Sequence, residues 1–195
     1  MIQRAVLLNA AGFQVVWWAM ALGLPRALSV WVAVVALLFM AHHLWQSTHW
    51  RHELGVIAAS AALGVVVDTS LMQWGQVRVQ PVNPEPLAQI QPWWLLLLWM
   101  CLGCTLRSSM QWICNWPRVG AVLCAIAGVL SYEAAKGFGL MSWTGVLPDV
   151  ILAGVWGVCF PVLVLWSNGR LKQRAITQEP SAQPDLNGQS DTAPH

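Results

Sequence analysis

Long apolar stretches separated by short polar ones fill most of this chain. Six of them reach the roughly 20 residues that a helix needs to cross a hydrocarbon core about 30 Å thick. These stretches are Ala5–Gly23, Ala27–Trp45, Leu54–Trp74, Trp93–Cys114, Pro117–Ala135 and Trp143–Trp166. The pattern therefore predicts an all-α polytopic membrane protein, a bundle of six transmembrane helices within residues 1–168.

The segments between the stretches are typical of turns and loops. Gly23-Leu24-Pro25-Arg26 predicts a tight turn between the first two helices, and Asn115-Trp116-Pro117-Arg118 predicts another between the fourth and fifth. Residues 75–92 contain four prolines and predict an extended polar loop. Residues 169–195 are rich in Gln, Pro, Ser and Asp, so they are expected to form a disordered cytoplasmic tail.

Composition agrees with a chain that faces lipid. Hydrophobic residues make up 57% of the chain and charged residues only 9%, which is too few charges to cover a water-facing surface. A net charge of +2 gives no basic face for nucleic acid. The lipid bilayer is therefore the expected environment, and nucleic acid is excluded as a partner.

Basic residues predict the orientation, because short loops rich in Lys and Arg stay in the cytoplasm. The six on the predicted side of the termini are Arg4, Arg51, Arg118, Arg170, Lys172 and Arg174, and the three on the other side are Arg26, Arg78 and Lys136. Both termini are thus expected in the cytoplasm, across a bacterial inner membrane. An alternative stays open: Ala19-Met20-Ala21 resembles a signal-peptide cleavage site, and cleavage there would leave five spans.

Ionisable residues inside the apolar stretches form an outer group: Asp68, Glu133, Lys136 and Asp149. Asp68 continues an i+4 row of small residues with Ser60 and Gly64, and positions four apart share a helix face where membrane helices pack closely. One interpretation is a polar pocket that opens outward. The other is local: Glu133 and Lys136 pair at i+3, and Asp149 occupies a first helical turn. Asp68 lacks such a local partner.

A second polar group is predicted near the cytoplasmic ends of the helices: His42, His43, His49, His52, Glu53 and Arg107. His49-x-x-His52-Glu53 presents three potential metal ligands on one turn, but no HExxH motif is present. Adjacent His42 and His43 point to different faces of a regular helix. We therefore expect an interfacial polar cluster, with no metal and no cofactor.

Several short motifs resemble a family of small bacterial inner-membrane proteins known only as a domain of unknown function. They are Asn9-x-x-x-Phe13-Gln14-x-x-Trp17, Asp68 ahead of Gly75, Pro92-Trp93-Trp94-Leu95 with Trp99, Ser108-Ser109 with Trp112, and Gly128-x-x-Ser131-Tyr132 ahead of Gly137 and Gly139. The resemblance covers about residues 1–168 and implies an inner-membrane location. It supplies no catalytic residue.

Three functions remain open at this stage. The first is a small transporter or lipid-handling protein that uses the outer pocket, with a lipid or a small apolar molecule as its ligand. The second is an accessory or structural subunit that binds a membrane protein partner or forms a homo-oligomer. Its polar residues would then only hold helices together. The third is an intramembrane enzyme acting on a lipid or quinone, although the chain shows no complete catalytic constellation.

Overall fold

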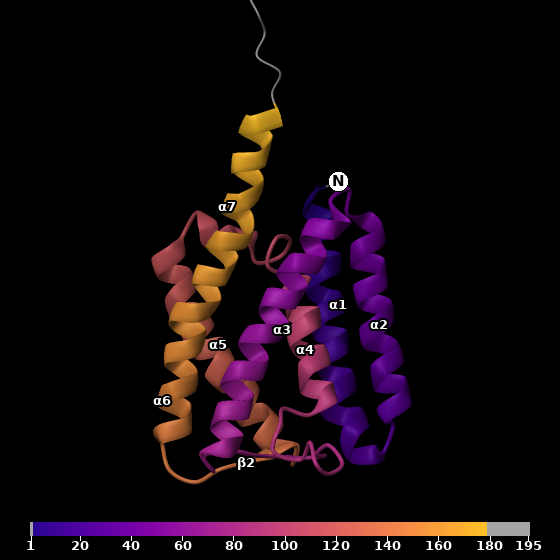
Figure 1. The fold of residues 1–195 in the computed structure, drawn as a ribbon, viewed down its shortest axis with the longest axis vertical. Helices are drawn as coiled ribbons and strands as arrows, with labels where there is room; N and C mark the ends of the chain where they lie inside the picture. Colours follow the sequence, from indigo (N-terminus) through magenta and orange to yellow (C-terminus); the bar gives the residue numbers. More distant parts are fainter. Residues whose placement is uncertain (1, 179–195) are drawn as a thin grey trace, which may run out of the picture.

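The computed structural model describes the backbone of residues 2–178 and the side chains of residues 4–169. It confirms an all-α bundle whose chain passes up and down between two ends (Figure 1). The helices that make the passes are α1 (Ile2–Gly23), α2 (Ser29–Gln46), α3 (Trp50–Gln73), α4 (Trp93–Gly103), α5 (Pro117–Gly137), α6 (Leu147–Gly154) and α7 (Phe160–Gln178). The short 3₁₀ helix η1 (Leu24–Arg26) turns the chain between α1 and α2.

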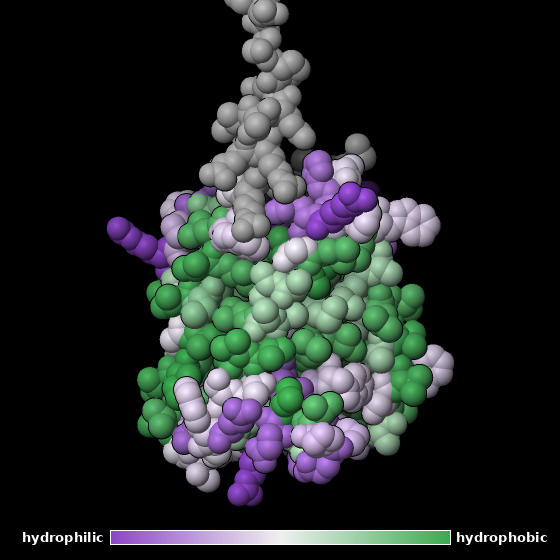
Figure 2. All heavy atoms as spheres, viewed as in Figure 1, coloured by the Kyte–Doolittle hydropathy of each residue, from purple (hydrophilic) through white to green (hydrophobic). Residues whose placement is uncertain are grey.

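The exterior of the bundle is suited to lipid. Five helical segments are long and apolar enough to cross a membrane, and α4 is a shorter apolar helix. An apolar belt crosses the middle of the face shown in Figure 2, and polar residues gather at the two ends of the molecule. Leu7, Val30, Val66 and Leu130 are each more than 60% exposed on this belt. Large apolar surfaces exposed in this way are typical of proteins that contact lipid or another protein.

The fourth pass is not the continuous helix over Trp93–Cys114 that the sequence predicts. Helix α4 ends at Gly103, turns follow over residues 104–110, and the 3₁₀ helix η2 covers Gln111–Cys114. Polar side chains of residues 105–109 compete for backbone hydrogen bonds, and the Thr105 hydroxyl donates to the Leu102 carbonyl at 2.7 Å. Irregular backbone at this depth is tolerated where it is buried in protein or lines a cavity.

The sixth pass contains a second irregularity. Helix α6 continues into the π-helical turn η3 (Val155–Cys159) and then into α7 without a break in the chain direction. A π turn inserts an extra residue and rotates the side chains that follow it. Helix α7 runs to Gln178, past the predicted end of the sixth span. The remainder of the predicted disordered tail, 179–195, lies outside the described residues.

Opposite the termini, two loops pair as a small sheet that the sequence did not predict. Strand β1 (Arg78–Val79) pairs antiparallel with β2 (Met141–Ser142) and so joins the 75–92 loop to the α5–α6 connection. Asn83 stabilises the long loop, because its amide donates to the Leu87, Ile90 and Gln91 carbonyls and accepts from the Trp93 backbone N–H. The loop therefore folds onto the end of the bundle.

The helices form two groups. Helices α1, α2, α3 and α4 pack together on one side, and α5, α6, η3 and α7 pack together on the other (Figure 1). The two groups meet mainly through η2, the β1–β2 pair and contacts between α3 and α7.

Candidate functional site

A buried carboxylate joins the two helix groups. Asp68 of α3 is 3% exposed and accepts three hydrogen bonds. The Trp99 indole N–H and the Gln91 amide each donate to Oδ2 at 2.7 Å, and the Tyr132 hydroxyl donates to Oδ1 at 2.7 Å. These donors belong to α4, to the loop before it and to α5. Among the described residues no cation pairs with Asp68, so neutral donors satisfy this carboxyl group.

Ser60, Gly64 and Asp68, the i+4 row of α3, all contact Trp99. The Ser60 hydroxyl donates to the Trp99 carbonyl at 2.8 Å, and the Trp99 ring lies so close to Gly64 that a Cβ there would approach the ring within 2.2 Å. Asp68 then accepts from the indole of the same residue. The i+4 row predicted a packing face, and the structure confirms it, since Ser60, Gly64 and Asp68 are all buried.

Two stacked tryptophans cross the boundary between the groups. The rings of Trp99 and Trp156 have centroids 5.4 Å apart at an interplanar angle of 23°. Trp156 lies against Gly128 of α5, where a Cβ would meet its ring at 2.1 Å. The order across the bundle is therefore Gly64, Trp99, Trp156 and Gly128. Trp156 belongs to η3, so the π turn sits at the residue that completes this stack.

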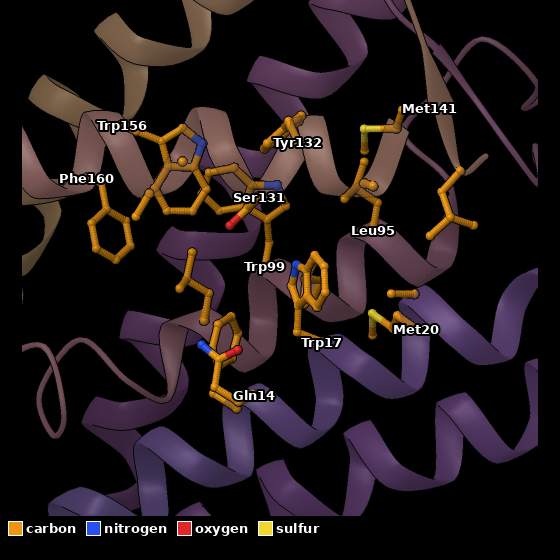
Figure 3. A pocket seen from close by; sticks show the side chains of 18 of the residues that line it. Gln14, Trp17, Met20, Leu95, Trp99, Ser131, Tyr132, Met141, Trp156 and Phe160 are labelled. Atoms are coloured by element: carbon orange, nitrogen blue, oxygen red, sulfur yellow. The ribbon is translucent and has the colours of Figure 1, made fainter. Parts of the chain in front are cut away.

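A cavity of about 150 Å³ lies beside this stack, between α1, α4 and α5. Figure 3 shows Gln14, Trp17 and Met20 of α1 across the cavity from Ser131, Tyr132 and Trp156. Apolar and aromatic side chains dominate its lining, which also includes Phe13, Leu95, Leu98, Trp99, Leu102, Met141 and Phe160. The Trp156 Nε1 atom is buried and has no hydrogen-bond partner within the described part of the chain.

The cavity reaches the lipid-facing surface. Gln14 of α1 and Ala127 of α5 both line it, and both residues are exposed. Toward the β1–β2 end, Trp17 and Trp18 contact Phe138 edge to face, with centroid distances of 6.2 and 5.9 Å. The opening therefore lies between α1 and α5, with an aromatic cluster beside it.

The other members of the predicted outer pocket lie apart from Asp68. The Lys136 ammonium donates to the Glu133 carboxylate at 3.4 Å and lies 4.4 Å from the centre of the Trp143 ring, and both side chains of the ion pair are more than one-third exposed. One carboxylate oxygen of Asp149 is buried without a partner among the described residues. Among the described residues, no hydrogen bond or ion pair joins Glu133, Lys136 or Asp149 to Asp68, so the Glu133–Lys136 pair and the buried Asp68 carboxylate are separate features.

At the end that carries the termini, part of the predicted polar cluster assembles around Glu53. One Glu53 oxygen accepts from the Arg107 guanidinium, and the other lies 3.3 Å from His43 Nε2. His52 Nε2 lies 3.2 Å from the Ser167 carbonyl and so joins α3 to α7. The His42 ring contacts Gln46, and the hydrogen bonds of His49 with Ser47 and Glu53 use its backbone, so no described hydrogen bond joins either imidazole ring to the Glu53 carboxylate.

A larger and more polar cavity lies beside Arg107. Its volume is about 740 Å³, and Val6, Trp112 and Leu165 form its apolar walls. Its polar lining comes mainly from the irregular segment after α4 and from α7: Arg107, Ser108, Ser109, Gln111, Asn115 and Asn168. The broken fourth pass therefore exposes polar groups to a cavity, as irregular backbone at membrane depth requires.

Comparison with known proteins adds a family and no activity. A family model described as "Protein of unknown function (DUF2878)" matches residues 6–162, which include parts of all six passes. The chain belongs to this family. No curated protein and no solved structure gives a significant match. Membership in the DUF2878 family agrees with the resemblance drawn from the sequence motifs.

Many of the motif residues that suggested a family of unknown function line one of the two cavities. Those that line the apolar cavity are Phe13, Gln14, Trp17, Trp94, Leu95, Trp99, Gly128, Ser131 and Tyr132, and those that line the polar cavity are Ser108, Ser109 and Trp112. Sequence reasoning did not assign Gln91, Trp99 and Tyr132 as the partners of Asp68, or Trp156 as the stacked ring. A signal was present, because Tyr132 follows Gly128 in an i+4 row and carries a donor that a buried carboxylate needs.

Proposed function

We propose that this DUF2878 protein is a lipid-handling protein that holds an apolar chain in the cavity beside Trp99 and Trp156. The observation that carries the proposal is an aromatic-lined cavity within the apolar belt that opens to the lipid-facing surface between α1 and α5. A cavity near 150 Å³ with apolar walls is known to accept a group of about the size of benzene. The ligand would therefore insert one segment of a chain or one ring, and the rest would lie outside the cavity.

The rigidity of the walls supports a binding site rather than a packing defect. Asp68 fixes the Trp99 indole and the Tyr132 phenol by hydrogen bonds. The close packing of the two stacked tryptophan rings on Gly64 and Gly128 fixes these rings as well. A cavity whose walls are held in this way cannot collapse at low cost when it is empty. In this account Asp68 is a positioning residue, since it acts through the aromatic rings and does not touch the ligand.

For location, we extend the proposal to a bacterial inner membrane with both termini in the cytoplasm. Arg51 and Arg118 lie at the end of the bundle where α1 begins, and Arg26 and Arg78 lie at the other end. Together with the basic residues after Gly169 in the sequence, the bias favours a cytoplasmic side for the termini.

The proposal is tested by the lipids that co-purify with the protein in mild detergent, identified by native mass spectrometry. Ser131 lines the cavity, so Ser131→Phe should fill it and reduce the bound apolar molecule about tenfold. Leu130 is the adjacent residue and is 62% exposed, so Leu130→Phe is the matched control and should retain the ligand. Equal occupancy in wild type and in Ser131→Phe would contradict the proposal.

Transport of a polar solute is a second candidate, favoured by one observation. The fourth pass loses its helix at Gly103, and the irregular backbone that follows lines a polar cavity, an arrangement found around the substrate sites of secondary transporters. Uptake into proteoliposomes would separate the two functions. Solute flux that survives Ser131→Phe would favour transport over lipid handling.

A further inference from the structure

The apolar cavity alone gives a ligand little reason to leave the bilayer. Lipid tails are as apolar as the side chains that line the cavity, so the hydrophobic effect does not favour one location over the other. Dispersion contacts with rigid aromatic rings contribute, but each contact is small. A molecule that prefers this site must gain affinity from another part of its structure, and the most direct source is a polar head.

The two cavities lie along one line of the bundle. On α1, Val6 lines the polar cavity and Phe13 lines the apolar one. Residues seven apart lie on nearly the same helix face, about 10 Å from each other along the axis. On α7, Leu165 lines the polar cavity and Phe160 the apolar one. Both walls therefore pass from polar to apolar surroundings in the same direction.

The segment after α4 makes the same transition. Arg107 and Ser109 line the polar cavity, whereas Met110 lines the apolar one. Between the two cavities, the Asn9 side chain donates to the Cys104 carbonyl at 3.1 Å and accepts from the Ser109 hydroxyl at 2.8 Å. These bonds fix α1 to the irregular segment that follows α4.

Among the described residues that line the polar cavity, Arg107 carries the charge. Its ion pair with Glu53 uses Nη1, while Nε is buried without a hydrogen-bond partner among the described residues. Both oxygens of Glu53 are already engaged, one by Arg107 and one by His43. A guanidinium carries five N–H donors in a planar fork that matches carboxylate and phosphate groups. Arg107 therefore retains donors that an anion would satisfy.

Neutral polar side chains complete the surroundings of this cation. Ser108, Gln111 and Asn115 line the same cavity, and their side chains make no hydrogen bond within the described part of the chain. A hydroxyl and two amides near a guanidinium supply further donors for the oxygens of an anion. Among the described residues that line this cavity there is no carboxylate.

From this arrangement we infer that the ligand is an anionic amphiphile, with a carboxylate or phosphate head beside Arg107 and its chain in the apolar cavity beside Trp99 and Trp156. The inference rests on the proposed function, since it assigns the ligand class for the same apolar cavity. It also predicts which way the molecule lies, with its head toward the end of the bundle that carries the termini.

The test uses photoreactive hexadecyl probes with the full-length protein in nanodiscs of a neutral lipid. One probe ends in a carboxylate, one in a phosphate monoester and one in a hydroxyl group. The anionic probes should label the protein with an affinity about tenfold higher than the alcohol. Millimolar inorganic phosphate or acetate should not compete, because neither carries a chain.

Variants separate the head from the chain. Arg107→Gln should reduce the preference for the anionic probes over the alcohol to about twofold. Because this change leaves Glu53 buried without its partner, the double variant Glu53→Gln with Arg107→Gln removes both charges and should lose the same preference in a folded protein. Ser131→Phe should abolish labelling by all three probes.

Each result bears on one of the two claims. Equal labelling by the three probes, all blocked by Ser131→Phe, would overturn the anionic head and leave the lipid-handling proposal intact. Competition by inorganic phosphate alone would also overturn the amphiphile, because the polar cavity would then bind an anion without a chain. Labelling that Ser131→Phe does not reduce would overturn the proposed function itself.

Discussion

The indole N–H of Trp99 lies 2.7 Å from the Oδ2 atom of Asp68, and the ring of Trp99 covers Gly64, one turn earlier on the same helix as Asp68. The opposite side of the stack, Trp156 on Gly128, repeats this ring-on-glycine contact in the second helix group. Asp68 also accepts from Tyr132 of that second group. One carboxylate thus helps to position both walls of the apolar cavity.

Asp68→Asn should lower both stability and ligand binding. An asparagine side chain has one acceptor oxygen, whereas the Asp68 carboxyl accepts three donors on two oxygens, so at least one donor must lose its partner. We expect a loss of about 1–2 kcal/mol in stability, measured by thermal unfolding in detergent. Glu133→Gln, in a partly exposed pair, should change stability by less than about 0.5 kcal/mol. Unchanged unfolding in Asp68→Asn would show that these hydrogen bonds contribute nothing.

The tryptophan stack depends on two glycines. A Cβ at residue 64 would approach the Trp99 ring within 2.2 Å, so Gly64→Ala should displace that ring and reduce ligand binding at least about tenfold. Gly55 lies on the same helix with no atom near its Cβ position, and Gly55→Ala should be neutral or stabilise the helix by up to about 1 kcal/mol. Ligand retention is measured by native mass spectrometry. Equal retention in the two variants would contradict this role of Gly64.

The sequence revealed the spans and the buried face of α3, because both follow from local periodicity. Five long apolar stretches became helices, and the row Ser60, Gly64 and Asp68 is buried. The partners of Asp68 could not be read from spacing, because Gln91, Trp99 and Tyr132 come from segments that only tertiary packing brings together. Hydropathy alone identifies a polar residue at membrane depth but not the group that satisfies it.

Two further departures have local causes. The fourth apolar stretch is long enough for a full span, yet its helix ends at Gly103. The polar side chains that follow form hydrogen bonds, as Thr105 and Ser109 do, or line the polar cavity, as Arg107 and Ser108 do, and such side chains disfavour a regular helix. Amphipathic tryptophan rings favour the headgroup zones of a membrane. Several are highly exposed there, but Trp94, Trp99 and Trp143 are buried, because their size also suits them to packing between helices.

The Glu53 and Arg107 pair should show strong energetic coupling. Both side chains are largely buried, so either single replacement removes one charge of a buried ion pair and should cost about 3–5 kcal/mol. In Glu53→Gln with Arg107→Gln both charges are gone, and the double variant should be more stable than the sum of the two single losses predicts. Thermal unfolding of the wild type, the two single variants and the double variant gives a double-mutant cycle. Simple additivity would mean that the two groups do not interact.

The orientation can be tested with reporter fusions along the chain. Fusions after Arg51 and Arg118 should report the cytoplasm, because the connections that carry these residues lie at the end of the bundle with the termini. Fusions within residues 82–88 and near Gly139 should report the exterior. A fusion after Arg118 that reports the exterior would contradict the proposed topology.

The central claim, that an apolar chain occupies the cavity between α1 and α5, is tested most directly by mapping where a chain becomes attached. A lipid with a photoreactive group in its acyl chain is irradiated with the full-length protein in nanodiscs, and the modified residues are identified by peptide mass spectrometry. The account predicts adducts on Trp17, Trp99, Ser131 or Trp156, which Ser131→Phe removes and Leu130→Phe leaves in place. Adducts confined to exposed lipid-facing residues such as Val30 and Val66, equal in all three proteins, would contradict it.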